Sequence, residues 1–491
     1  MIDEREIRPD IPVKIPSRNG CEAEITDVPF PVPFPKGLVY APPARGTWTI
    51  AHSPMLIPGC HEIYVCCPCC LHGVVLSADE IPDGGNGRFS MVTLTNENIL
   101  KGDLEEMMIE GVSEVLKSLP ERPRLVECFT SCVQHFLNID LKVVYRALRK
   151  RFPDTDFIDG YMIPTLARKL TPDMLGRRQL LRAASAKRAA KDEILRQKKD
   201  RAVSLIVNYY PLDPDSELKE LFEKADYEVR DFASCKTYED YLALADAERA
   251  LVFVSASVPA AKDFQKQTGM EYLYLPYSYS LEELRREFCT LSERFGLEMP
   301  DTEDYEQKIA ARADGVQKLF NNTPLVLDYT ASPRILQMAL FLLEYGFHVR
   351  AVYTDAFSSE EEEIYNLLRE KYPRLLIRST QHYKMRLLPR DEGKKEKLVA
   401  VGQKAAYFTG TEHFVNMIEN GAVLQDGSQP VQLYGYSGIL HFLDLLEKAF
   451  SAKSDVRSII EVKAFGCSGR IEGGECGVPC TFPARSGKEE A

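Results

Sequence analysis

Cysteines crowd into eleven residues of this chain, and two more follow some sixty residues later. The segment reads Cys-His-Glu-Ile-Tyr-Val-Cys-Cys-Pro-Cys-Cys. Its thiols, and those of the later pair, belong to Cys60, Cys66, Cys67, Cys69, Cys70, Cys128 and Cys132. Packing gives little reason to repeat cysteine, which behaves in a core as a small hydrophobe. Thiolate sulfur is the preferred ligand of iron–sulfur clusters and of zinc. The spacing therefore predicts a metal site.

A cubane iron–sulfur cluster needs four ligands, which two subunits can share. Cys60, Cys67, Cys70 and Cys128 could supply four from one chain. The additional thiols suggest a second cluster, a larger cluster or a cluster that bridges two protomers. Adjacent cysteines on a strand point to opposite faces, so neighbours would not easily bind the same iron unless the turn at Pro68 breaks the alternation.

Zinc is the alternative metal, because residues 67–70 form a Cys-x-x-Cys knuckle of the kind that holds structural zinc. His61 and His72 lie beside the thiols. We interpret both as structural hydrogen-bonding groups rather than ligands, although a neutral imidazole is a plausible replacement ligand.

Composition excludes several classes of protein. The 491 residues carry a net charge of −12, which argues against a nucleic-acid-binding surface. The chain contains no long uncharged apolar run, so we predict no membrane span. Its N-terminus is acidic and contains prolines, without the apolar core of a signal peptide. We therefore predict a cytoplasmic protein whose thirteen cysteines stay reduced.

Strand and helix patterns alternate along most of the chain, which is typical of α/β domains with parallel, doubly wound sheets. We predict three Rossmann-like domains. The expected segments are a proline-rich arm at 1–45, a first domain carrying the cysteines at 46–201, a second domain at 202–315, a third at 316–450, and a tail at 451–491 that contains Cys467, Cys476 and Cys480.

Three helices in this scheme bear on the architecture. Apolar residues at helical spacing predict one helix over Asn98–Leu119. The basic run of Pro172–Arg201 predicts a long, solvated helix that joins domains, with an anionic partner as the alternative. Another helix is expected over Thr411–Asn420. The short strand at Arg124–Cys128 should end in a turn that presents functional groups, as strands of α/β sheets do at their carboxyl ends.

The order of these elements resembles component 1 of nitrogenase and its relatives, over about Gly46–Phe450. The segments that carry the resemblance are Pro58–Val65 leading into the cysteines, Glu127-Cys128 followed by Leu137–Asp140, Ala250–Tyr274 with its Gly269–Tyr272 end, and Tyr434–Gly438 before the last helix. The resemblance implies three α/β domains, favours iron–sulfur over zinc, and maps one family ligand to Cys69 or Cys70. It also implies a dimer, with an identical or related subunit.

The chain departs from the family at its best-known ligands. No cysteine occurs near Tyr40–Gly46, and the positions that would hold the iron–molybdenum cofactor carry Ser255 and Tyr434–Gly435. We therefore predict that the chain does not reduce dinitrogen. The remaining interdomain cleft would be lined by strand-end residues. The candidates are Asn208, Tyr209, Ser255, Ser257, Tyr277, Thr330 and Tyr434.

The favoured hypothesis is the catalytic component of a nitrogenase-like two-component reductase. The chain has no P-loop, so the resemblance implies a separate ATP-dependent iron–sulfur reductase as its electron donor. A non-catalytic scaffold for metallocluster assembly is the competing hypothesis. A zinc-stapled α/β binding protein is the third. The catalytic residues are unknown at this stage.

Overall fold

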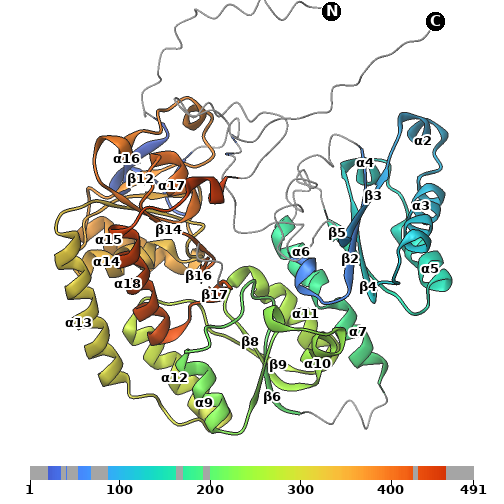
Figure 1. Cartoon of the computed structure of the whole chain (residues 1–491), viewed down its shortest axis with the longest axis horizontal. Helices are drawn as coiled ribbons and strands as arrows, with labels where there is room; N and C mark the ends of the chain where they lie inside the picture. Colours follow the sequence, from blue (N-terminus) through green and yellow to red (C-terminus); the bar gives the residue numbers. More distant parts are fainter. Residues whose placement is uncertain are drawn as a thin grey trace, which may run out of the picture.

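Three α/β units make up the protein, arranged around a common junction (Figure 1). The computed structural model describes residues 20–34, 40, 42, 53–67, 87–161, 170–191, 200–423 and 429–460. Cys69, Cys70 and His72 lie outside the described residues, as do Cys467, Cys476 and Cys480. The predicted α/β fold with parallel sheets is confirmed. The exact domain boundaries stay a prediction. The boundary expected at residue 315 falls within α13 (Thr302–Phe320).

The first sheet is entirely parallel, in the order β3-β2-β4-β5. Its strands are β2 (Cys60–Cys66), β3 (Phe89–Thr93), β4 (Leu125–Thr130) and β5 (Asp156–Tyr161). Both β2 and β4 are buried along their whole length, because helices and the second domain cover the two faces of the sheet. The helices are α2 (Asn96–Lys101), α3 (Leu104–Ser118), α4 (Cys132–Phe136) and α5 (Leu141–Arg151).

The single helix expected over Asn98–Leu119 is wrong. Gly102, with a φ of 71°, ends α2 in the left-handed conformation that glycine adopts at low cost, and α3 begins after Asp103. The apolar stripe of α3 then packs on the sheet, with Met108 and Val112 against the side of β2 that carries Ile63.

The second sheet is also parallel, in the order β7-β6-β8-β9. Its elements are β6 (Asp200–Leu205), α9 (Glu217–Lys224), β7 (Glu228–Asp231), α10 (Tyr238–Ala243), β8 (Ala247–Val252), α11 (Val258–Thr268), β9 (Glu271–Tyr274) and α12 (Leu281–Phe295). No helix within the described ranges combines the length and apolarity that crossing a membrane requires.

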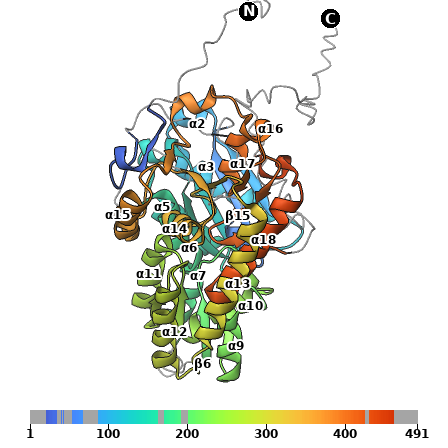
Figure 2. The same cartoon turned by 90° about the vertical axis from the view of Figure 1, so that its left-hand side faces the viewer.

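The third sheet has the order β1-β12-β11-β10-β13-β14, and only its edge strand β1 is antiparallel. Its elements are β1 (Glu22–Glu24), β10 (Leu325–Asp328), α14 (Ile335–Glu344), β11 (Val349–Tyr353), α15 (Glu362–Lys371), β12 (Leu376–Arg378), α16 (Glu392–Lys395), β13 (Val399–Val401), α17 (Gln403–Thr409), β14 (Phe414–Val415) and α18 (Gly435–Ser451). In Figure 2, α13 and α18 run side by side along this unit.

The basic run after residue 170 forms two packed helices instead of one solvated helix. α6 (Pro172–Leu180) and α7 (Arg182–Ala190) meet at Leu181, and Arg177 and Arg188 are buried. The cations of these helices pair with acids from all three domains. The pairs are Arg177–Asp173, Arg177–Glu419, Arg178–Asp263, Arg182–Asp159, Lys187–Asp156 and Arg188–Asp246. The basic side chains of α6 and α7 therefore connect the three domains through ion pairs.

The helix expected over Thr411–Asn420 is also wrong. This segment forms β14 and then the first strand of an antiparallel sheet made of β15 (Met417–Ile418), β16 (Gly421–Ala422) and β17 (Val431–Gln432). The turn residues Glu419 and Asn420 both have positive φ, and Asn-Gly is the typical signal for such a hairpin. The turn carries Glu419 toward the domain junction.

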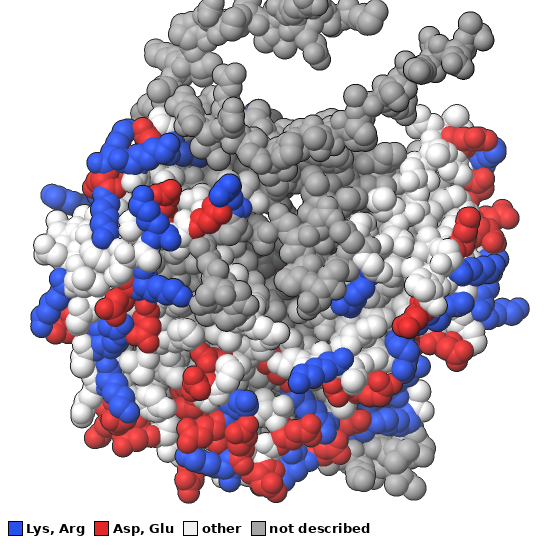
Figure 3. Space-filling view, in the orientation of Figure 1, with Lys and Arg blue, Asp and Glu red and all other residues white. Residues whose placement is uncertain are grey.

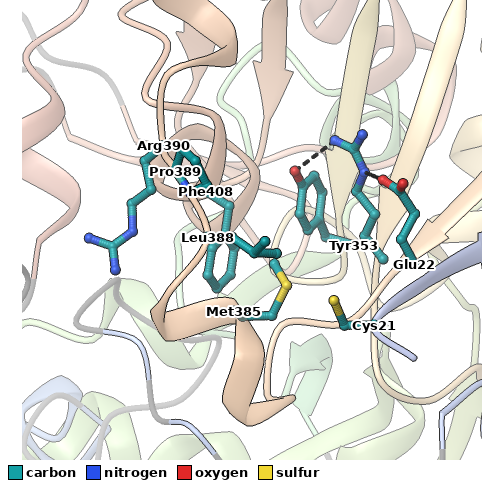
Figure 4. A pocket seen from close by; sticks show the side chains of 9 residues that line it. Cys21, Glu22, Tyr353, Met385, Leu388, Pro389, Arg390 and Phe408 are labelled. Carbon is teal, nitrogen blue, oxygen red and sulfur yellow. Dashed lines mark hydrogen bonds and ion pairs between the residues drawn. The ribbon is translucent and has the colours of Figure 1, made fainter. Parts of the chain in front are cut away.

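The N-terminal segment lies over the third domain, where β1 extends the sheet at β12. Arg378 of β12 binds Glu22 at 2.5 Å and donates to the Tyr353 hydroxyl at 2.9 Å, beside the buried Cys21 thiol (Figure 4). Further along, the Phe30 ring stacks on Phe357 with centroids 5.9 Å apart. Residues 20–34, part of the predicted proline-rich arm, therefore form a strap on this domain.

Phe30→Ala tests this strap. Loss of the ring from its contacts with Phe357 and Tyr365 should lower the free energy of unfolding by about 1–3 kcal/mol, less than for a fully buried phenylalanine because Phe30 is half-buried. Thermal denaturation followed by circular dichroism measures the change. Val32→Ala, at a neighbouring exposed position, is the control and should leave the transition within error. Equal stability of both variants would contradict the strap's role.

Candidate functional site

Three cysteines lie at the carboxyl edge of the first sheet. The last register pair between β2 and β4 is Val65–Thr130, and Cys67 and Cys132 each follow it by two residues. Cys66 is one residue beyond Val65 and pairs with Thr93 of β3. Parallel strands present functional groups at this edge. The structure therefore brings Cys66, Cys67 and Cys132 to one end of the sheet.

Local hydrogen bonds fix the backbone at this edge. Ser131 and Gln134 form a reciprocal cap at the start of α4, so the turn that carries Cys132 has a defined geometry. Gln134 Nε2 also donates to the Val65 carbonyl at 2.5 Å. This bond ties the turn after β4 to the end of β2, and it couples the segment of Cys132 to that of Cys66 and Cys67.

Cys60 lies far from this edge, which argues against its predicted grouping with Cys67 and Cys70 around one cluster. Cys60 pairs with Leu125 at the amino end of the sheet, six residues before Cys66. At about 3.3 Å per residue, the strand separates the two by about 20 Å. Burial and the carboxyls of Glu127 and Glu62 raise the pKa of the Cys60 thiol, so it stays protonated.

Cys128 lies between these two levels. It pairs with Ile63 on β2 and Asp159 on β5, about 13 Å back along the strands from the level of Cys67. Its side chain belongs to the apolar layer under α3 and α5, and burial raises the pKa of its thiol. Cys128 and Cys67 share this face of the sheet. The role of Cys128 as a ligand stays a prediction.

The fit to a metal centre rests on the donor set at the edge. Within the part of the chain that the structure describes, no group of three or more cysteines, histidines or carboxylates is close enough to hold a metal ion. Cys66, Cys67 and Cys132 lie at the same edge but do not form a metal site by themselves, so further ligands are needed. Cys69 and Cys70, outside the described residues, follow Cys67 after Pro68 in the sequence. The thiol chemistry of this edge fits an iron–sulfur cluster once such thiols are added.

A buried pair of carboxyl groups escaped the sequence analysis. Glu62 and Glu127 are register partners on β2 and β4 and are 0% and 2% exposed. The Tyr64 hydroxyl donates to Glu62 at 2.7 Å, whereas one oxygen of each carboxyl has no hydrogen-bond partner. Burial is the main cause that raises the pKa of both groups. The only sequence signal was their presence in otherwise apolar buried strands.

His61 is a structural group, as the sequence hypothesis held. Its Nε2 lies 2.8 Å from the Ser90 hydroxyl on β3, and burial lowers its pKa to about 4. Arg88 donates to the carbonyls of Cys60, Met55 and Ile57 and so holds the start of β2.

The proposed cleft residues gather at the carboxyl edge of the second sheet and in the third domain. Asn208, Tyr209, Ser257, Tyr277, Thr330 and Tyr434 are buried, and Ser255 is half-buried. Thr330 binds the buried Asp328 within the third domain, which makes it a structural group. The others line the region where the three domains meet.

Arg177 occupies the centre of that junction. Its guanidinium is fully buried, binds Glu419 at 2.5 Å and Asp173 at 2.9 Å, and donates to the Ser257 hydroxyl at 3.0 Å. It also lies 4.4 Å from the centre of the Tyr209 ring. The first, second and third domains therefore meet through one side chain, which the sequence hypothesis had assigned to a solvated helix.

Two contacts of Arg177 involve strained backbone. Val207, whose carbonyl accepts from Arg177 at 3.4 Å, has a φ of 59°, and Glu419 has a φ of 47°. The left-handed region costs a β-branched residue such as valine about 1–2 kcal/mol. Burial also raises the pKa of Glu419, and Arg177 opposes that rise. The junction holds these unfavourable features because the ion pair offsets them.

Tyr434 lies on the seam between the second and third domains. Its hydroxyl donates to Glu287 of α12 at 2.7 Å, and the other Glu287 oxygen has no hydrogen-bond partner. Glu217 of α9 accepts from the backbone N–H groups of Tyr436 and Ser437, at the start of α18. Buried carboxyl groups from the second domain thus hold the first turn of the last helix.

The three α/β units and the thiols at a strand edge can be compared with known protein families. The family model for nitrogenase component 1 type oxidoreductases matches residues 55–451. The chain belongs to this family, whose members are mostly enzymes and typically bind iron–sulfur clusters.

Solved nitrogenase structures share the fold. The structure "Nitrogenase Cp1 at pH 6.5" superposes with a TM-score of 0.62 at 14% identity, covering 85% of this chain and 94% of that chain. "Nitrogenase Cp1 at pH 5" gives a TM-score of 0.55 at 14% identity, covering 88% and 94%. Comparison with curated proteins gives no match. At this identity the structures show a common fold alone.

Glu287→Gln tests the electrostatics of the seam. Burial is the main cause that raises the pKa of Glu287 to about 8, with Glu283 adding to the rise and Tyr434 and Arg334 opposing it. Because Glu287 holds its proton more tightly in the folded protein, its contribution to stability is complete below the unfolded pKa of 4.5. That contribution is lost as the pH rises through the folded pKa of about 8. The wild type should lose about 1.4 kcal/mol more than the variant for each pH unit between 5 and 8.

Urea denaturation at several pH values measures this difference. Glu283→Gln is the control. Arg334 lowers the pKa of Glu283, so this carboxyl stabilises the fold at higher pH, and its loss should change the pH dependence in the opposite direction. Parallel pH profiles for the wild type and Glu287→Gln would contradict the assignment.

Proposed function

We propose that this chain is the iron–sulfur component of a nitrogenase-like two-component reductase. Cys67 and Cys132, together with Cys69 or Cys70, would hold a [4Fe–4S] or larger cluster at the carboxyl edge of the first sheet, and Cys66, on the opposite face of β2 from Cys67, would serve a larger or bridging cluster. Such a cluster would supply single low-potential electrons. The observation that supports this most is the gathering of thiols from two separate segments at one sheet edge, in a chain of this family.

The protein supplies a defined environment for that edge. The cap at Ser131 and the bond from Gln134 to Val65 fix the relative position of the two thiol-bearing segments. The buried strands behind them exclude water from one side. Cys128 lies on β4, buried behind this edge, and is a secondary candidate ligand.

An electron donor would dock beside the thiols. Phe136 and Leu137, at the end of the helix that begins with Cys132, are 73% and 47% exposed. On the neighbouring helix α5, Lys142, Arg146 and Lys150 repeat at four-residue spacing and are exposed. Exposed apolar side chains with exposed cations on the next helix suit an acidic partner surface. We propose an ATP-dependent iron–sulfur reductase as this partner.

A second chain, identical or related, is part of the proposal. Thiols at a sheet edge that lack a full ligand set within the described residues suit a centre shared between subunits. Membrane and nucleic-acid partners have no place in this proposal. On the surface seen in Figure 3, acidic and basic side chains are interspersed over the lower part of the molecule.

Dinitrogen reduction on a molybdenum cofactor is not proposed, because Ser255 and Tyr434 stand where the family's cofactor ligands would fall. Arg177 and Glu419 also occupy the domain junction with protein side chains. The absence of the two cofactor ligands at Ser255 and Tyr434 also favours the second candidate, a scaffold that assembles a metallocluster and passes it on. A zinc-stapled binding protein remains the third candidate, since a Cys-x-x-Cys knuckle also suits zinc.

Paired cysteine variants test the metal centre. Cys67→Ser and Cys132→Ser should each lower iron and acid-labile sulfide by at least half in anaerobically purified protein, because each removes a thiol at the edge. Cys60→Ser is the matched control, about 20 Å away along the strand, and should retain both elements in full. Zinc at stoichiometry without sulfide, or equal losses in all three variants, would contradict the proposal.

Phe136→Asp tests the docking surface. A charge in the apolar patch should slow reduction of the cluster by an ATP-dependent iron–sulfur reductase at least tenfold, while iron content is unchanged. Leu387→Asp alters a similarly exposed leucine in the third domain and should leave the rate unaffected. Equal rates for the two variants would place the donor elsewhere. Rapid cluster reduction without turnover of any substrate would favour the scaffold.

A further inference from the structure

We propose that the buried polar group around Arg177 is a binding site for a small molecule that carries a carboxylate, and that Glu419 occupies it in the ligand-free protein. The proposal deepens the proposed function by naming a substrate class for the junction, and it rests on that function for its redox context. The site itself is defined by the side chains of Arg177, Ser257 and Tyr277, with Glu419 as the internal occupant.

One donor at this point, the Tyr277 hydroxyl, is not used by the protein itself. Arg177, Ser257 and Tyr277 are 0%, 1% and 1% exposed. The Tyr277 hydroxyl has no hydrogen-bond partner, although it lies within electrostatic range of both Arg177 and Glu419. An unsatisfied buried hydroxyl is unfavourable, so its presence beside a buried guanidinium indicates an acceptor that the protein does not provide.

The position in the fold is one where α/β proteins bind ligands. Asn208, Ser257 and Tyr277 follow strands β6, β8 and β9 at the carboxyl edge of the second sheet. Asn208 Oδ1 is a second buried atom there without a hydrogen-bond partner. A ligand with a carboxylate and a hydrogen-bond donor would therefore meet complementary groups at one edge.

Glu419 behaves as an internal substitute for that carboxylate. It reaches Arg177 from the tip of a hairpin whose backbone is fixed to the third domain through the carbonyls of Thr330 and Ala331. Only its side chain enters the junction, so rotation of that side chain would release Arg177 without movement of the hairpin.

A carboxylate is the group that this set recognises. Arg177 Nη2, which now donates to Glu419, would donate to the carboxylate of the ligand, and the unpartnered Tyr277 hydroxyl can add a second donor. Asp173 remains on Arg177 and is 27% exposed, so the site lies one side chain below the surface. Because the displaced Glu419 side chain stays in the protein, its carboxyl must take up a proton or reach solvent for the charge of the junction to stay unchanged when a carboxylate enters.

Calorimetric titration under anaerobic conditions with acetate, succinate and citrate, at fixed ionic strength, tests the site. Glu419→Gln should bind at least one of these probes tenfold or more tightly than the wild type. The double variant Arg177→Met/Glu419→Gln should lose that gain. Asp263→Asn removes a different carboxylate paired with the same helix, on Arg178, and should not raise affinity. No gain in Glu419→Gln, or a gain retained in the double variant, would overturn the proposal.

Tyr277→Phe provides a test that does not depend on the stability of the Glu419 variant, because it removes an unpartnered hydroxyl. It should weaken binding of the probe to the wild-type background by fivefold or more, and unchanged affinity would overturn the role of Tyr277. Iron and sulfide content, measured on the same samples, reports the metal centre separately. A protein without iron that still binds the carboxylate would refute the redox function alone.

Discussion

The ion pairs of α6 and α7 are the constraint on which the rest of this structure depends. Buried arginines are stable only when every charge finds a partner, and removal of one partner of a buried pair typically costs about 3–5 kcal/mol. Of the buried arginines, Arg177 pairs with Glu419 of the third domain and Arg188 with Asp246 of the second, whereas the partly exposed pairs Arg178–Asp263 and Arg182–Asp159 add less. The relative placement of three independent sheets follows from these contacts, and so does the character of the junction between them.

This arrangement separates two kinds of chemistry. Thiols gather at the edge of the first sheet, where an exposed apolar surface lies beside them. Charged and hydroxyl groups gather at the edge of the second sheet, buried and centred on Arg177. An electron-transfer centre near the surface and an anion site at the junction would let one chain receive electrons on one side and hold an acceptor on the other. Membership of the nitrogenase component 1 type oxidoreductase family agrees with such a division.

Much of the fold could be predicted from sequence because its strands are short, apolar runs between helical patterns. The parallel sheets and the strand leading into the cysteines follow from local pattern alone. The failures have long-range causes. The run at 172–190 is basic, but its partners lie on β5, α11 and a distant hairpin, so its burial could not be read locally. Met417–Ala422 has a helix-like composition, whereas its Asn-Gly turn and the Thr330 and Ala331 carbonyls make it a hairpin. The separation of Cys60 from Cys66 required knowing that the strand extends through both residues.

The central claim is that iron and sulfide are bound at the carboxyl edge of the first sheet. X-ray absorption at the iron and zinc edges of anaerobically purified protein tests it most directly. The account predicts iron coordinated by sulfur with a second iron as a near neighbour, and little zinc. A zinc edge with sulfur ligands, or no bound metal in a folded sample, would contradict it.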